Sequence, residues 1–297
     1  MRIFLTGATG HIGSAVIGEL LSADHEVVGL ARTDDGEAQL LAAGASVKRG
    51  AIQDTAVLAS TAAESDGVIH LAYMHRPPAG ADPAAADELA IKAIGDGLAG
   101  SGKPFVGTSG TLVHTMPNST EADLGDPDSV AGGRVRAENA VIALNDRQVR
   151  ASVVRLPPTV HSRLDTHGFL PTLIGIARSN GVSGYVGAGV NRWPAVHTLD
   201  AAVLFRLALE WDGSGARWHG AADEGVPFRE IAEAIGHQLG VPTASINAAD
   251  AHEHFGWLGS IVAVDNPVST AVTRRILRWI PSNPGLLDDL RDGHYFA

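Results

Sequence analysis

The chain has no cysteine and no long apolar run, and each absence excludes a class of protein. Without cysteine among its 297 residues, it can form no disulfide, no catalytic thiolate and no cysteine-based metal site. No segment approaches the ~20 consecutive apolar residues that cross a bilayer. The apolar start at 3–5 ends at Thr6-Gly7, too early for a signal peptide. We therefore expect a cytoplasmic protein with no membrane partner.

Positive charge is also scarce. The 22 Lys and Arg residues stand against 33 Asp and Glu, a formal net charge of −11. No basic surface is available to displace counterions from phosphates, so nucleic acid is excluded as a partner. The 13 histidines show no H-E-x-x-H or other metal-binding spacing, and we predict no metal. A small-molecule substrate remains the expected partner, and a homodimer stays open.

The first half of the chain alternates short β-rich segments with amphipathic helical ones. This alternation is typical of a doubly wound parallel sheet with helices on both faces. Beyond Pro157 the sequence becomes richer in Gly and Pro, and the alternation is lost. We therefore predict an α/β fold with two parts: a Rossmann-type domain formed by 1–160 and rejoined by 195–222, and a smaller substrate lobe formed by 161–194 and 223–297.

The strongest local motif is TGATGHIG at 6–13, between the first expected strand and the first expected helix. Gly7 permits a tight turn, Gly10 lets a pyrophosphate approach the backbone, and Gly13 lets the helix pack on the strand. Free N–H groups and the helix dipole then face the pyrophosphate. The motif predicts a dinucleotide site with contacts from Gly7, Thr9, Gly10, His11, Ile12 and Gly13.

The G-x-x-G-x-x-G spacing of this motif resembles the short-chain dehydrogenase/reductase superfamily. Over the whole chain the resemblance is to its extended, NAD-dependent epimerase/dehydratase-like members. It implies that Ile52, in a segment similar to the family's GDLxD, and Leu71-Ala72, similar to its HLAA, lie along the cofactor. It also implies that Pro157, in RLPPTVHS, borders the nicotinamide.

The end of the second expected strand reads GLAR. An acidic residue there would bind the adenosine ribose and repel a 2′-phosphate, but Ala31 stands in its place. The next residue, Arg32, suits a charge-assisted contact with a 2′-phosphate. The sequence therefore favours NADP(H) over NAD(H).

The resemblance implies a catalytic Ser or Thr after the fifth strand and a Tyr-x-x-x-Lys pair on the next helix. Ser109 best matches the first, with Thr111 as a helper. In the segment 131–138, aligned with the family's YxxxKAxxE, Gly132 stands for the Tyr and Arg136 for the Lys. Arg136 suits cofactor binding, but a guanidinium cannot exchange a proton in the useful range.

Three outcomes follow from the missing tyrosine: another residue supplies the proton, the substrate or water handles it, or the fold binds the dinucleotide without turnover. Tyr73, His75, His114, His161 and Tyr185 are the candidates for the first, and imidazole suits acid–base work near neutrality. The predicted substrate pocket comprises His75, His114, His161, Tyr185 and Trp193.

The sequence thus favours an NADP(H)-dependent oxidoreductase, a reductase or dehydrogenase, acting on a small organic carbonyl, alcohol or activated alkene. Ser109 would polarise the substrate and Arg136 would hold the cofactor. Two alternatives stay open: a non-catalytic NADP(H) sensor that binds a partner, and a cofactor-dependent isomerase or epimerase. Asp200 is expected to cap the apolar helix that follows it.

Overall fold

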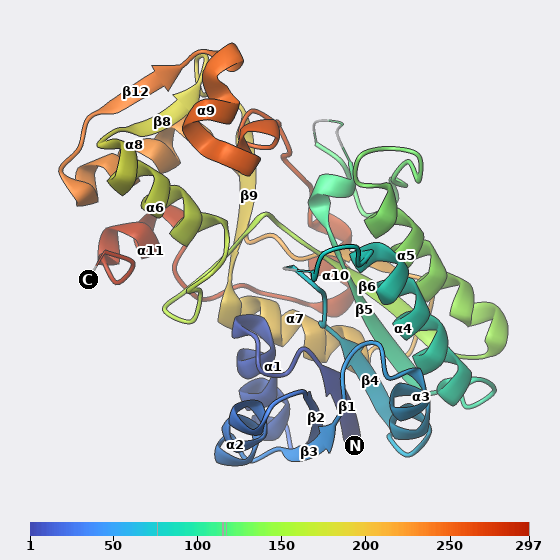
Figure 1. The fold of residues 1–297 in the computed structure, drawn as a ribbon. Helices are drawn as coiled ribbons and strands as arrows, with labels where there is room; N and C mark the ends of the chain where they lie inside the picture. Colours follow the sequence, from blue (N-terminus) through green and yellow to red (C-terminus); the bar gives the residue numbers. More distant parts are fainter. Residues whose placement is uncertain (76, 115, 117, 297) are drawn as a thin grey trace.

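A seven-stranded parallel sheet lies at the centre of the larger part of the molecule (Figure 1). The computed structural model describes residues 1–75, 77–114, 116 and 118–296. The strand order is β10-β6-β5-β4-β1-β2-β3, and every neighbouring pair is parallel. The strands are β1 (Arg2–Thr6), β2 (Glu26–Ala31), β3 (Ser46–Arg49), β4 (Gly67–His70), β5 (Pro104–Gly110), β6 (Arg150–Leu156) and β10 (Arg217–His219).

This sheet confirms the predicted α/β fold of the Rossmann type. Six of its strands are those that the sequence predicted. The seventh, β10, consists of Arg217, Trp218 and His219 and pairs with β6. It was missed because three residues carry too little periodicity to mark a strand.

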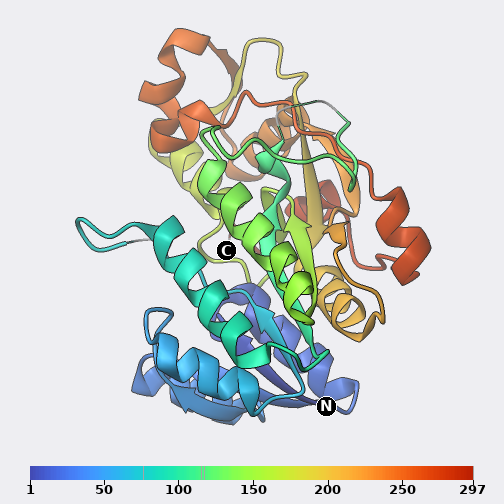
Figure 2. The ribbon, with the colours of Figure 1, turned by 90° about the vertical axis from the view of Figure 1, so that its right-hand side faces the viewer.

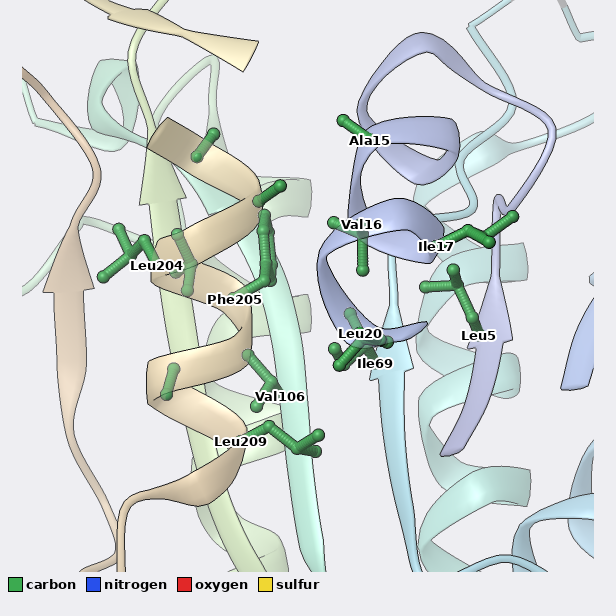
Figure 3. Packing of buried hydrophobic residues seen from close by; sticks show 14 of the residues in the cluster. Leu5, Ala15, Val16, Ile17, Leu20, Ile69, Val106, Leu204, Phe205 and Leu209 are labelled. Carbon is green, nitrogen blue, oxygen red and sulfur yellow. The ribbon is translucent and has the colours of Figure 1, made fainter. Parts of the chain in front are cut away.

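Helices cover both faces of the sheet, because successive residues of each strand point to opposite sides. In β1, Ile3 and Leu5 pack in one cluster and Phe4 in the other. Side chains of α7 and α1 meet over the first face (Figure 3). That face carries α1 (His11–Ser22), α2 (Asp34–Ala42) and α7 (Thr198–Glu210); the other carries α3 (Thr55–Ala63), α4 (Pro83–Leu98) and α5 (Gly132–Ala143).

A smaller lobe lies beyond the carboxyl ends of the strands, and Figure 1 shows it above the sheet. It holds two small sheets, ordered β11-β9-β7 and β12-β8, and its core is a separate apolar cluster around Trp193. Its elements are β7 (Thr159–His161), α6 (Phe169–Asn180), β8 (Ser183–Val186), β9 (Arg192–His197), β11 (Asp223–Pro227), α8 (Phe228–Leu239), β12 (Thr243–Ile246), α9 (Ala251–Phe255) and α11 (Leu286–Asp292).

The chain crosses between the two parts more than once. After β9 it returns as α7, and later α10 (Ala271–Leu277) packs on α7 and β10. Leu277 and Trp279 consequently lie in the same cluster as the first face of the sheet. Short 3₁₀ helices occur at η1 (Thr111–Val113), η2 (Leu144–Arg147), η3 (Ala248–Asp250) and η4 (Gly256–Ser260).

The expected helix cap at Asp200 is wrong. His197 caps α7, since its Nδ1 accepts a hydrogen bond from the Leu199 amide at 3.3 Å. The Asp200 carboxylate accepts instead from the amides of Ser282 and Asn283, at 2.9 and 3.1 Å. It therefore fixes the segment after α10 against α7.

Two helices of the second face, α4 and α5, lie side by side in both views (Figures 1 and 2). Their mutual approach matters for the site, because each contributes a charged side chain to it. Every helix in the part of the chain that the structure describes is too short or too polar to cross a membrane.

Candidate functional site

At two positions of the glycine turn after β1, close contacts within the protein leave no room for a side chain. Gly7 has φ +68°, a conformation that other residues rarely adopt, and a Cβ there would lie 2.7 Å from backbone atoms of Leu71 and Ala72. A Cβ on Gly13 would lie 2.1 Å from the Gly7 carbonyl oxygen. The turn is therefore pressed against both α1 and the segment that follows β4.

Gly10 differs from these two glycines. A Cβ there would meet only the Gly7 oxygen, at 3.3 Å, and both Thr9 and Gly10 are exposed. Gly10 is the N-cap of α1, and no side chain caps the helix. The first amides of α1 consequently face open space that a side chain at Gly10 would enter. This cradle fits a pyrophosphate, which needs N–H donors and close backbone approach.

His11, the first residue of α1, carries an imidazole beside this turn. Its Nδ1 lies 4.0 Å from the buried Asp165 carboxylate, and its Nε2 has no hydrogen-bond partner among the described residues. Burial lowers the pKa of His11, against the opposing effect of Asp165. Burial raises the pKa of Asp165. The lobe thus contacts the predicted dinucleotide turn directly.

Five other predicted cofactor residues follow strands of the same sheet: Arg32, Ile52, Leu71, Ala72 and Pro157. Arg32 is exposed immediately after β2, and Pro157 is buried immediately after β6. The segment after β4 is fixed to β1, because the Ala72 amide donates to the Thr6 hydroxyl oxygen at 3.2 Å. Ile52 is only 6% exposed and packs in the core of the second face. It therefore offers little open surface to an adenine.

A chain of polar contacts, here called the Asp87 network, runs from β1 to α5. The Thr6 hydroxyl lies 2.7 Å from His70 Nδ1, and His70 Nε2 lies 3.0 Å from Asp87 Oδ1. Asp87 Oδ2 lies 3.8 Å from Arg134 Nη1. The Arg134 guanidinium in turn stands 3.4 Å above the ring centroid of Tyr73, a cation–π contact. Thr6, His70 and Asp87 are buried, which makes the network a rigid support.

The predicted role of Arg136 is not supported by this geometry. The Arg136 side chain is 51% exposed, and its Nε donates to Glu88 at 3.1 Å on the outer side of α5. Arg134, two residues earlier, turns inward to Asp87 and Tyr73. Residues two apart on a helix face different directions, so an alignment shifted by two would select Arg134 in place of Arg136. The sequence did not single out Arg134.

Two of the predicted candidates lie beside Arg134. The rings of Tyr73 and His75 contact each other edge to face, with centroids 5.2 Å apart. His75 is exposed on its outer side, yet partial burial lowers its pKa, and the charge of Arg134, followed by His11, lowers it further. His75 therefore lies within electrostatic reach of Arg134 on α5 and of His11 at the start of α1.

Ser109 and Thr111 have different surroundings. Ser109 is 5% exposed, and its Oγ finds no hydrogen-bond partner in the described part of the chain. It lies next to β4, because the neighbouring Thr108 hydroxyl donates to the His70 carbonyl at 2.7 Å. The Thr111 hydroxyl instead donates to the Asn266 side chain at 2.7 Å. The expectation that Thr111 assists catalysis is therefore corrected: Thr111 fixes the segment around Asn266.

The remaining predicted pocket residues do not gather around His75. Trp193 is fully buried against Phe169 and Phe228, in the core of the lobe. His161 is also fully buried, with Nδ1 2.8 Å from Asp289. Both residues are therefore buried in the interior, and neither lines a pocket around His75.

Tyr185 and His114 are displaced as well. The Tyr185 ring packs in the lobe beneath Arg229, 5.5 Å from its guanidinium carbon. His114 is buried with its ring 6.5 Å from that of His219, and burial followed by the charge of Arg155 lowers its pKa. His75 is thus the one predicted pocket residue that the fold brings beside the Asp87 network.

A second polar cluster, here called the Glu138 network, was not predicted. Arg155 donates to both carboxylate oxygens of Glu138, at 2.9 and 2.6 Å, and Arg217 Nε donates at 2.5 Å. Arg155 also lies 3.2 Å from His219 Nε2. The sequence of β6 gives no sign that Arg155 is fully buried. Glu138 on α5 is the acidic residue that could have suggested a buried ion pair.

Comparison with known proteins gives a consistent picture. The model of the NAD dependent epimerase/dehydratase family matches residues 3–88, which include the glycine turn and Asp87. Over 296 residues, 100% of both chains, the protein is 42% identical to "Uncharacterized protein C2A9.02" of Schizosaccharomyces pombe. Over 295 residues, 98% of both chains, it is 45% identical to "Uncharacterized protein YLL056C" of Saccharomyces cerevisiae.

Among solved structures, UDP-glucose 4-epimerase of Thermotoga maritima with UDP-glucose has a TM-score of 0.79. The match covers 100% of this chain and 98% of that one, at 17% sequence identity. At that identity the likeness is one of fold. It extends over both the sheet and the smaller lobe.

Proposed function

The chain belongs to the NAD-dependent epimerase/dehydratase family of extended short-chain dehydrogenases/reductases, and from this membership we propose that it is an NADP(H)-dependent oxidoreductase. Its substrate would be a small organic carbonyl, alcohol or activated alkene. The observation that carries the proposal is the cradle at Gly10, whose open side lies against the uncapped start of α1. A dinucleotide held by this cradle at its pyrophosphate would supply or accept a hydride at its nicotinamide ring.

The chain's own residues divide the work of binding. The first amides of α1 would hold the pyrophosphate, and the exposed guanidinium of Arg32 would pair with a 2′-phosphate. Ser109 has a buried hydroxyl with no protein partner in the described residues, which suits a hydrogen bond to a substrate oxygen. The position of Arg32 after an acid-free strand end supports NADP(H) over NAD(H).

Binding of both reduced dinucleotides to two variants tests the proposal. Gly10→Val places a side chain in the cradle, and we expect it to abolish binding of NADPH and NADH alike. Arg32→Ala removes a charge-assisted contact of ~1.5–3 kcal/mol, so NADPH should bind at least about tenfold more weakly while NADH binding is unchanged. Fluorescence titration or calorimetry measures both affinities.

Arg178→Ala, on the exposed end of α6 in the lobe, is the matched control and should retain both affinities. A wild-type protein that binds neither dinucleotide would overturn the proposal. Turnover of NADPH with a panel of aldehydes, ketones and enones, reduced in Ser109→Ala, then distinguishes an oxidoreductase from a protein that only binds the dinucleotide.

A further inference from the structure

The helix that should supply a catalytic phenol supplies none. Helix α5 begins Gly132-Gly133-Arg134, with Ala131 as its N-cap, so its first turn carries no acid–base group that works near neutrality. An oxidoreductase that interconverts alcohol and carbonyl must still move one proton for each hydride. Of the three outcomes that the missing tyrosine leaves, a side chain near the same edge of the sheet that holds this proton is the one that the geometry addresses.

We propose that His75 is the proton-transfer residue, and that Tyr73 and Arg134 position it. This inference rests on the proposed function and names the acid–base group of that reaction. The alternative within the same stack is the Tyr73 phenol. A phenol ordinarily titrates near 10 and an imidazole near 6.5, and general acid–base catalysis is most efficient close to the working pH.

The three side chains form a stack that is anchored at one end. The Arg134 guanidinium lies 3.4 Å from the Tyr73 ring centroid, and the Tyr73 ring meets the His75 ring at 65°, 5.2 Å between centroids. Behind Arg134 stands Asp87, which is connected through His70 to Thr6 at the end of β1. The residue after Thr6 opens the glycine turn. The support of His75 and the predicted cofactor site therefore share one strand end.

The other end of the stack is open. His75 is exposed, and within the described residues its ring packs edge to face on Tyr73 without a side-chain hydrogen bond. Its neighbours leave it free to exchange a proton with a substrate or with solvent. Ser109, which would bind the substrate oxygen, stands beside the end of β4, the strand from which the His75 segment departs.

Charged groups approach His75 from each element packed around it. Arg134 faces it from α5 and His11 from α1, while Asp87 of α4 lies behind Arg134, and Asp165 of the lobe lies beside His11. Partial burial, followed by the charge of Arg134 and then by His11, lowers the pKa of His75 below its ordinary value. The imidazole is therefore neutral at neutral pH, which is the form that accepts a proton.

The proton balance is simple in the direction of alcohol oxidation. The substrate O–H bond breaks, and its proton passes to the unprotonated ring nitrogen of His75. The carbinol C–H bond breaks as its hydrogen leaves with the electron pair for the oxidised nicotinamide, and a C=O double bond forms. In reduction, protonated His75 returns the proton to the substrate oxygen.

The pH dependence of His75→Asn tests the assignment. We expect kcat/KM for alcohol oxidation by the wild type to decline on the acid side of the ordinary imidazole pKa of about 6.5, where His75 becomes protonated. His75→Asn should lose ~10²–10⁴-fold in kcat and lose this limb of the profile, with NADPH affinity unchanged. His237→Asn, on the exposed face of α8, is the matched control and should keep the wild-type rate and profile.

NMR titration of the histidine resonances of the cofactor-free protein gives a readout independent of turnover. The resonance absent from His75→Asn should titrate below 6.5 in the wild type. Substituting Tyr73→Phe should leave turnover within a few-fold of the wild type, because the phenylalanine ring can still pack against His75. Thermal unfolding of each variant checks that it is folded, and His75→Gln serves if His75→Asn is not.

The outcomes separate the two proposals. Normal dinucleotide binding and turnover with an unchanged rate and profile in His75→Asn overturn the role of His75 alone. A loss in Tyr73→Phe as large as that in His75→Asn assigns the proton to the phenol and overturns it as well. A wild type that binds no dinucleotide overturns the proposed function, and this inference with it.

Discussion

Two polar networks meet on the same stripe of α5, and they differ in whether they are closed. Arg134 and Glu138 are four residues apart, one helical turn. The Glu138 carboxylate receives Arg155 and Arg217, and the side chains of Glu138 and Arg155 are at most 1% exposed. In the Asp87 network the last charged residue is Arg134, whose side chain is 30% exposed. The ring of Tyr73 packs on Arg134, and the exposed His75 packs on Tyr73.

The difference separates structural from functional polarity. A buried charge whose partners are all present stabilises the positions of the elements that hold it, and its removal costs stability. A charged side chain that has a protein partner and is still partly exposed to solvent, as Arg134 is, can also contact a ligand. The Glu138 network joins α5, β6 and β10, whereas the Asp87 network points toward the glycine turn. The two should respond differently to mutation and to pH.

Glu138→Gln should have the largest effect. It leaves Arg155 buried and its positive charge unbalanced, and breaking a buried ion pair from one side costs ~3–5 kcal/mol of the free energy of unfolding. Urea unfolding monitored by circular dichroism measures the loss. The double variant Glu138→Leu/Arg155→Met removes the two fully buried charges and leaves only Arg217, which is partly exposed, so it should recover much of the stability. A loss below about 1 kcal/mol in Glu138→Gln would show that the network is not closed.

The pH dependence of stability should come next in size. His219 is fully buried; its Nε2 accepts from Arg155 and its Nδ1 faces the Ser269 carbonyl oxygen at 2.9 Å, so the neutral form fits. Burial, followed by the charge of Arg155, lowers the pKa of His219 to about 4. The unfolded chain binds this proton near 6.5, so its contribution to stability is present above pH 6.5 and is lost as the pH falls toward 4.

The size of this contribution is at most roughly 3.4 kcal/mol, the difference between the two pKa values at 1.36 kcal/mol per unit. Urea unfolding at pH 7.5, 6 and 5 should therefore show a smaller decline in His219→Gln than in the wild type. His237→Asn, exposed on α8, should follow the wild type. Parallel curves for wild type and His219→Gln would contradict the assignment.

The fold was predictable because its signals are local and repeated. Strand and helix periodicities gave the first six strands, and TGATGHIG marked the turn between β1 and α1. Strand β10 carried no such repetition, and its position depends on pairing with β6, far away in sequence. The same limit hid the return of Trp279 to the face covered by α7.

The site was predictable only where backbone geometry defines it. The roles of Gly7 and Gly13 follow from close approach, which the motif encodes. The choice between Arg134 and Arg136 depended on which side of α5 faces α4. The buried positions Glu138 and Val141 would have indicated it, since Arg134 lies four residues before Glu138 on the same stripe. Partners such as Asn266 lie too far along the chain for any local pattern.

The smallest effect should come from the arginine of the open network, and it tests the comparison most directly. Arg134→Met removes a cation–π contact of ~0.5–2 kcal/mol, but Asp87 keeps its partner His70, and the Arg134 side chain is partly solvated already. We expect stability to fall by about 1 kcal/mol, well below the Glu138→Gln loss.

Because the charge of Arg134 lowers the pKa of His75, the His75 resonance should titrate at higher pH in Arg134→Met than in the wild type. Arg136→Met, on the outer side of the same helix, should leave that titration unchanged. If both variants shifted the titration equally, the effect would come from the overall charge of α5 rather than from the contact of Arg134 with Tyr73. The Asp87 network would then not differ in its effect on His75 from the exposed charges of α5.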